Sequence, residues 1–93
     1  MRTLEIELFT SPGCPRCARL RTLVDAYAAR ARSGVHVCVV DVVAELDRAV
    51  ELGVRATPAL VVDGRLVLTG TPTPARLRSL LDERLGRSRG KRE

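Results

Sequence analysis

Two cysteines three positions apart, Cys14 and Cys17, constrain the fold of this chain more than any other feature. Residues 4–9, which precede them, alternate apolar and polar side chains and predict a strand, whereas the residues that follow predict a helix. The pair therefore lies where a strand turns into a helix. At such a junction the first thiol faces unpaired backbone N–H groups and the positive end of the helix dipole, which favour a thiolate. This arrangement is typical of dithiol–disulfide exchange.

The length of 93 residues predicts one domain, with a core built from aliphatic side chains because Phe9 and Tyr27 are the only aromatics. The formal charge is +5, and part of it lies at the carboxyl end. We expect residues 1–87 to form the domain and residues 88–93 to form a basic, disordered tail. No aromatic stacking residue accompanies the tail, so we do not expect it to bind nucleic acid.

The amino-terminal segment bears on the compartment. Glu5 and Glu7 interrupt its apolar run, so the sequence predicts neither a secretory signal nor a membrane span. Three cysteines without a secretory signal indicate a reducing compartment, and we expect a cytoplasmic protein. In that compartment a close cysteine pair is more often catalytic or metal-binding than structural.

Apolar periodicity predicts the next three elements. A helix over residues 15–32 ends before Gly34, and a β-branched strand follows over residues 35–40. The strand is expected to be buried on at least one face, and we expect both. A short helix over residues 43–52 follows and stops at Gly53. Its predicted apolar positions are Leu46, Ala49 and Val50.

The last third of the chain predicts a hairpin and a helix. Residues 59–62 and 65–68 flank Asp63 and Gly64, a dipeptide suited to a type I′ turn because both positions need a positive φ. A final helix over residues 74–85 begins with a Thr-Pro cap.

The element order is therefore β-α-β-α-β-β-α, an α/β fold. Helical crossovers predict that the first three strands are parallel, and the hairpin predicts that the last two are antiparallel. The result is a mixed four-stranded sheet with helices on both faces. Glu5 and Glu7 would lie on one face of a central strand, so we expect them near its ends or paired with arginines.

Over residues 3–86 the chain resembles the small thioredoxin/glutaredoxin-like proteins of the thioredoxin superfamily. The resemblance rests on residues 9–17, 53–58 and 62–64 and on Gly70. It implies a thioredoxin-like fold and a thiol–disulfide oxidoreductase that reduces protein or small-molecule disulfides. It also implies no cofactor beyond the redox-active disulfide, and recharging by an electron-donating reductase or by glutathione.

The resemblance also implies roles for individual residues. Cys14 is expected to attack and Cys17 to resolve the mixed disulfide, and a cis peptide bond is expected before a proline that lies against them. The candidate substrate-binding residues are Pro15, Arg16, Thr57 and Pro58. Two positions depart from thioredoxins, because Gly13 replaces a tryptophan and Leu8 replaces a buried aspartate.

An alternative is a CxxC metal-binding or metallochaperone-type protein, although such proteins run β-α-β-β-α-β and lack a Thr-Pro before a hairpin. We expect no metal site, with His36 on the surface of its strand. Cys38 is expected to be a buried small hydrophobe, with a third redox thiol as the alternative. The expected partners are disulfide-bearing substrates and an electron donor, with neither nucleic acid nor membrane, and we expect a monomer.

Overall fold

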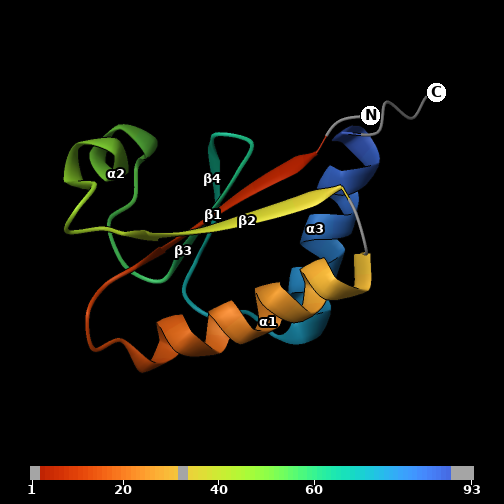
Figure 1. Ribbon diagram of the computed structural model, residues 1–93, viewed down its shortest axis with the longest axis horizontal. Helices are drawn as coiled ribbons and strands as arrows, with labels where there is room; N and C mark the ends of the chain where they lie inside the picture. Colours follow the sequence, from red (N-terminus) through yellow and green to blue (C-terminus); the bar gives the residue numbers. More distant parts are fainter. Residues whose placement is uncertain (1–2, 32–33, 89–93) are drawn as a thin grey trace.

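The computed structural model of the protein describes residues 3–31 and 34–88 (Figure 1). The strands are β1 (Leu4–Thr10), β2 (Val35–Asp41), β3 (Ala59–Val62) and β4 (Arg65–Thr69). The helices are α1 (Pro15–Ala31), α2 (Leu46–Leu52) and α3 (Pro74–Ser88). The strands form one mixed sheet in the order β2-β1-β3-β4. The predicted element order and the mixed four-stranded sheet are confirmed.

The direction of β3 corrects the sequence prediction. β1 pairs parallel with β2 but antiparallel with β3, so the first three strands are not all parallel. The register places Thr10 beside Asp41 and Phe9 beside Ala59, so the connection from β2 to β3 begins and ends at the same end of the sheet. The helix in this connection, α2, has seven residues. At about 10 Å it is too short to carry the chain back along a strand of about 23 Å.

Each face of the sheet has its own apolar cluster, which confirms that helices cover both faces. Figure 1 shows α1 and α3 together on one face and α2 on the other, near one end. The α1 and α3 cluster contains Leu4, Ile6, Leu8, Leu20, Val24, Tyr27, Leu60, Val62, Leu77 and Leu81. The α2 cluster is smaller and contains Phe9, Ala49, Val54, Ala59 and Val61.

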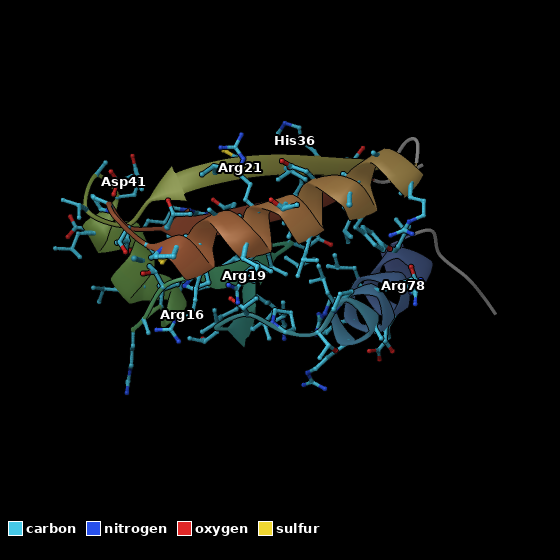
Figure 2. All side chains as sticks on the ribbon, turned by 90° about the horizontal axis from the view of Figure 1, so that it is seen from below. Arg16, Arg19, Arg21, His36, Asp41 and Arg78 are labelled. Carbon is cyan, nitrogen blue, oxygen red and sulfur yellow. A yellow bond between two sulfur atoms is a disulfide. The ribbon has the colours of Figure 1, made fainter. Side chains whose placement is uncertain are left out.

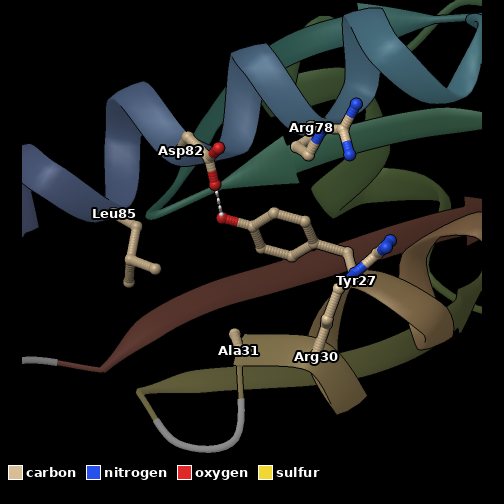
Figure 3. A pocket seen from close by; sticks show the side chains of 6 residues that line it. All are labelled: Tyr27, Arg30, Ala31, Arg78, Asp82 and Leu85. Carbon is tan, nitrogen blue, oxygen red and sulfur yellow. Dashed lines mark hydrogen bonds between the residues drawn. The ribbon is translucent and has the colours of Figure 1, made fainter.

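A tyrosine joins α1 to α3 at the end of α1 that lies away from the cysteines. The hydroxyl of buried Tyr27 donates to the carboxylate of Asp82 at 2.7 Å (Figure 3). A pocket of about 330 Å³ lies beside this contact. Arg30 and Arg78 border it, with Ala31 and Leu85 (Figure 3). The contact ties the last turn of α1 to α3.

β2 lies at the edge of the sheet, which corrects the prediction for its side chains. Val35 and Val37 pack partly against the α1 and α3 cluster, but His36 and Cys38 are exposed. The expectation that Cys38 is buried is therefore wrong. In the register Cys38 lies beside Glu7 and is exposed. The exposure of His36 was predicted.

Of the two glutamates of β1, Glu7 has an arginine partner as expected, whereas Glu5, near the start of the strand, pairs with a histidine. The carboxylate of Glu7 accepts two bonds from the Arg48 guanidinium, from Nε at 3.0 Å and from Nη2 at 2.6 Å. These bonds raise the pKa of Arg48 above its ordinary value, because the carboxylate accepts hydrogen bonds from the charged guanidinium and stabilises it. Glu5 pairs with Nδ1 of His36 at 2.9 Å. The arginine pair also ties α2 to the sheet.

The second helix is shorter and less buried than predicted. It begins at Leu46 because the carboxylate of Asp41 accepts the N–H of Val43 at 2.9 Å and the carbonyl of Asp41 accepts the N–H of Glu45 at 3.0 Å, which makes a turn instead. Of the three predicted apolar positions only Ala49 is buried. Leu46 and Val50 are 59% and 69% exposed, so the apolar repeat of this helix does not form a continuous buried face.

The hairpin and the last helix agree with the sequence. Asp63 has φ 50° and Gly64 has φ 81°, as the type I′ turn requires. The hydroxyl of Thr73 caps α3 by accepting the N–H of Arg76 at 3.2 Å. The helix runs to Ser88, three residues further than predicted, and the rest of the predicted basic tail, residues 89–93, lies outside the described residues. Among the described helices, none is long and apolar enough to cross a membrane.

Candidate active site

The cysteine pair lies at the start of α1, after the short loop that follows β1. Cys14 immediately precedes the first helical residue, Pro15, and Cys17 lies in the first turn. The two cysteines are joined by a disulfide, with their Cα atoms 5.2 Å apart. Proline suits the first helical position because it has no N–H to leave unpaired there. The predicted strand–helix junction is therefore confirmed.

The sulfur of Cys14 occupies the place of a helix-capping side chain. The N–H of Cys17 donates to Sγ of Cys14 at 3.1 Å, as it would to the oxygen of a capping serine or aspartate. A negatively charged sulfur accepts such a bond more strongly than a neutral one, and the helix dipole adds to the effect. The backbone thus favours the thiolate at Cys14.

The two sulfurs differ in accessibility. Cys17 is buried, with 4% of its surface exposed, on the face of α1 that carries Leu20 and Val24. Cys14 is partly exposed at the helix terminus. An incoming disulfide can therefore reach Cys14 more easily than Cys17.

Arg16 lies between the two cysteines and is exposed. Figure 2 shows its side chain extending away from the amino end of α1. Its backbone carbonyl accepts the hydroxyl of Thr71 at 3.3 Å. This contact holds the loop between β4 and α3 against the first turn of α1.

The loop before β3 completes the site. The Thr57–Pro58 peptide bond is cis, as expected, and Pro58 is buried. The hydroxyls of Ser11 and Thr57 share a hydrogen bond at 2.7 Å, and the carbonyl of Pro58 accepts the N–H of Gly70 at 2.8 Å. Three loops therefore meet at one end of the sheet.

Ser11 was not predicted from the sequence to be a site residue. Its only signal is a hydroxyl side chain in the loop that leads to the cysteines, and its partner lies 46 positions away. Cys38, by contrast, is not part of this assembly. In the strand register it lies beside Glu7, which is three residues before the last residue of β1. Cys38 is therefore about 10 Å along the strand from the end of the sheet that carries the cysteine pair. The described residues also contain no group of three or more metal-ligating side chains.

Comparison with known proteins agrees with this geometry. A family model described as Thioredoxin domain matches residues 4–82. A thioredoxin from Methanocaldococcus jannaschii is 34% identical over 85 residues, which cover 91% of this chain and 100% of the relative. A probable thioredoxin from Archaeoglobus fulgidus is 33% identical over 78 residues, covering 82% of this chain and 84% of the relative.

A solved structure supports the fold. A mutant thioredoxin from Halobacterium salinarum superposes with a TM-score of 0.75 at 23% identity, covering 99% of this chain and 80% of that one. A disulfide at a strand–helix junction, with a cis-proline loop hydrogen-bonded to the loop that leads to the cysteines, defines a dithiol redox protein. The chain belongs to the thioredoxin family. It is a thiol–disulfide oxidoreductase, and the metal-binding alternative is not favoured.

Proposed function

We propose that Cys14 is the attacking thiol and Cys17 the resolving thiol in the reduction of disulfide substrates. The observation that carries this assignment is the bond from the Cys17 N–H to Sγ of Cys14, together with the greater exposure of Cys14. The bond favours an anion at the sulfur that a substrate can reach. The buried sulfur of Cys17 is placed one helical turn away, where it can attack Cys14.

The reaction has two exchanges. The Cys14 thiolate attacks one sulfur of the substrate disulfide, a Cys14–substrate bond forms, and the other substrate sulfur leaves as a thiolate that takes up a proton. Cys17 then loses its proton and attacks Sγ of Cys14, which releases the second substrate sulfur as a thiolate. One substrate disulfide is reduced and the Cys14–Cys17 dithiol is oxidised. Leu8 is a buried apolar residue, so no carboxylate at that position takes the proton of Cys17.

The substrate-binding surface comprises Pro15, Arg16, Thr57 and Pro58. Support comes from the hydroxyl bond between Ser11 and Thr57, which ties the loop before β3 to the loop before the cysteines. An extended substrate segment beside Thr57 would pair with its backbone as a short added strand. The exposed guanidinium of Arg16 would lie at the rim of this surface.

The electron donor is a reductase or glutathione, the substrates carry accessible disulfides, and the protein acts in the cytoplasm without a metal or organic cofactor. The family relationship supports this assignment. Turnover measured with each donor separately would identify which one recharges the enzyme.

Cysteine variants test the assignment. Cys14→Ser is expected to abolish reduction of a disulfide-bonded test protein, and Cys17→Ser is expected to accumulate a mixed disulfide that mass spectrometry detects. Cys38→Ala is the matched control and should retain activity, because Cys38 lies on β2 away from the pair. Alkylation of the reduced protein should modify Cys14 before Cys17. The opposite order, or a trapped substrate on Cys17, would reverse the two roles.

A further inference from the structure

The outer edge of β2 is open and lacks the features that normally block an edge strand. Among the described residues no strand pairs with it. β2 is seven residues long, pairs with β1 without a register shift, and contains neither proline nor lysine. The opposite edge of the sheet, β4, is shorter, begins with Arg65 and has a register shift against β3. Charges, bulges and short length protect β4 from pairing with another chain, and β2 has none of this protection apart from its end residue Asp41.

The hydrogen bonds to β1 identify which backbone groups point outward. The carbonyl of Gly34 accepts the N–H of Leu4 at 2.7 Å, and the N–H of Val42 donates to the carbonyl of Thr10 at 2.8 Å. The register between these two bonds is continuous, and the direction of the backbone groups alternates along a strand. The even-numbered residues of β2 therefore bond to β1. The outward residues are Val35, Val37, Val39 and Asp41.

We propose that two copies of this chain associate by antiparallel pairing of their β2 edges, with the two-fold axis at Cys38. Cys38 is the middle residue of β2. In this register Val37 forms a hydrogen-bonded pair with Val39 of the second copy, and Val35 does so with Asp41 of the second copy. Cys38 lies opposite itself in a non-hydrogen-bonded pair, where the Cα atoms of facing residues are about 4.5 Å apart. The contact is isologous and closes as a dimer.

The surface suits a second copy because the pairing is self-complementary. No like charges face each other, since Asp41 meets a valine and His36 meets Val40. β-branched cross-strand pairs stabilise such ladders, and Val39, which is 39% exposed, would be partly covered. Thr57 precedes β3, which lies on the other side of β1, so the proposed substrate surface stays accessible.

An interface made by one strand from each copy is small. Stable complexes bury about 1,600 Å² in total, and a single strand pair buries less. We therefore expect monomer and dimer to exchange, and the measurements need to span about 10 μM to about 1 mM. The chain that the sequence predicts to be a monomer would populate both forms in this range.

The test uses the full chain in its oxidised form. In that form Cys14 and Cys17 are joined by a disulfide. Of the three cysteines, only Cys38 then carries a free thiol. A short bis-maleimide is expected to link two chains through Cys38, and sedimentation equilibrium is expected to show a dimer as concentration rises. Hydrogen exchange at the amides of Val37 and Val39 should slow with concentration by about tenfold or more, whereas the amides of His36 and Cys38, already bonded to β1, should not change.

Two variants separate this edge from the exposed side chains of α2. Val39→Pro removes an outward N–H, which an edge strand tolerates, and is expected to abolish the dimer. Val50→Lys changes a residue that is 69% exposed on α2 and is expected to leave the dimer intact. If Val39→Pro fails to fold by circular dichroism, Val39→Lys replaces it. A protein that stays monomeric throughout, a dimer that survives the Val39 variant, or a dimer lost only in Val50→Lys would overturn the proposal.

Discussion

The chemistry of Cys14 depends on one backbone position. A residue that precedes the first turn of a helix can accept the N–H of the residue three positions later, and here the acceptor is sulfur. Cys17 supplies that N–H and also the second thiol, so in the proposed reaction one short segment both activates Cys14 and resolves the mixed disulfide. Arg16 lies between the two cysteines in the sequence, and its charged side chain is exposed to solvent. The strength of its effect on the thiolate is set by how much solvent screens it.

Arg16→Glu is expected to lower the reduction potential of the cysteine pair. The substitution replaces a charge that stabilises the Cys14 thiolate with one that opposes it, and so disfavours the reduced protein. For an exposed charge the expected decrease is about 10–20 mV, measured by equilibration with glutathione buffers. Arg19→Glu makes the same change one turn further along α1 and should shift the potential less. Equal potentials in the wild type and Arg16→Glu would make Arg16 an ordinary surface residue.

At the residue scale the sequence predicted local chemistry but not long-range contacts. Cys14, Cys17 and Pro58 were identified because their signal lies in neighbouring residues or in a short motif. Ser11 was missed because its role arises from a contact with a residue 46 positions away. Cys38 was misplaced because a run of valines looks the same in an edge strand as in a central one.

At the scale of elements, the site consists of loops held by the ends of strands and helices. Ser11 follows β1 and Thr57 precedes β3, and these two strands are neighbours in the sheet. Their hydroxyl bond therefore fixes two adjacent loops relative to each other. The carbonyl of Pro58 and the N–H of Gly70 extend the arrangement to the loop after β4.

Ser11→Ala is expected to reduce kcat/KM for a protein disulfide by about 2–10-fold, because it removes one hydrogen bond that holds Thr57 in place. The reduction potential should stay unchanged, since the groups around Cys14 are untouched. Steady-state kinetics and glutathione equilibration measure the two quantities separately. Ser79→Ala, on the exposed face of α3, is the control. A changed potential with normal kinetics would show that Ser11 acts on the thiols instead of on the proposed substrate-binding loop before β3.

The sequence predicted which elements form, but not how all of them pair. The turn at Asp63 and Gly64 was predictable because its dihedral requirement is local. The direction of β3 was not, because the crossover rule presumes a helix long enough to return along the sheet. α2, with seven residues, does not meet that condition.

At the scale of the whole molecule, stability is concentrated on one side of the sheet. The cluster beneath α1 and α3 contains Leu60, Leu77 and Leu81, all nearly or fully buried. The cluster beneath α2 is smaller, and Leu46 and Val50 on that helix face solvent. The two sides should therefore respond differently to the loss of an apolar side chain.

Leu81→Ala is expected to lower the free energy of unfolding by about 2–5 kcal/mol, because it leaves a cavity in the larger cluster. Leu46→Gln should change the free energy by no more than about 0.5 kcal/mol, because that side chain is 59% exposed. Urea titration followed by circular dichroism measures both. A large loss of stability in Leu46→Gln would indicate that another surface covers α2 in solution.

The closeness of the two cysteines in sequence links redox state to folding in a simple way. A disulfide restricts an unfolded chain more as the loop it closes lengthens, and here the cysteines are three positions apart. Oxidation therefore restricts the unfolded chain only slightly. In a closed thermodynamic cycle, the difference in reduction potential between the folded protein and its unfolded chain, multiplied by nF for this two-electron couple, equals in magnitude the difference in unfolding free energy between the reduced and oxidised forms. Two denaturation curves, one for each redox state, would thus measure how strongly the amino end of α1 in the folded protein favours the dithiol over the disulfide.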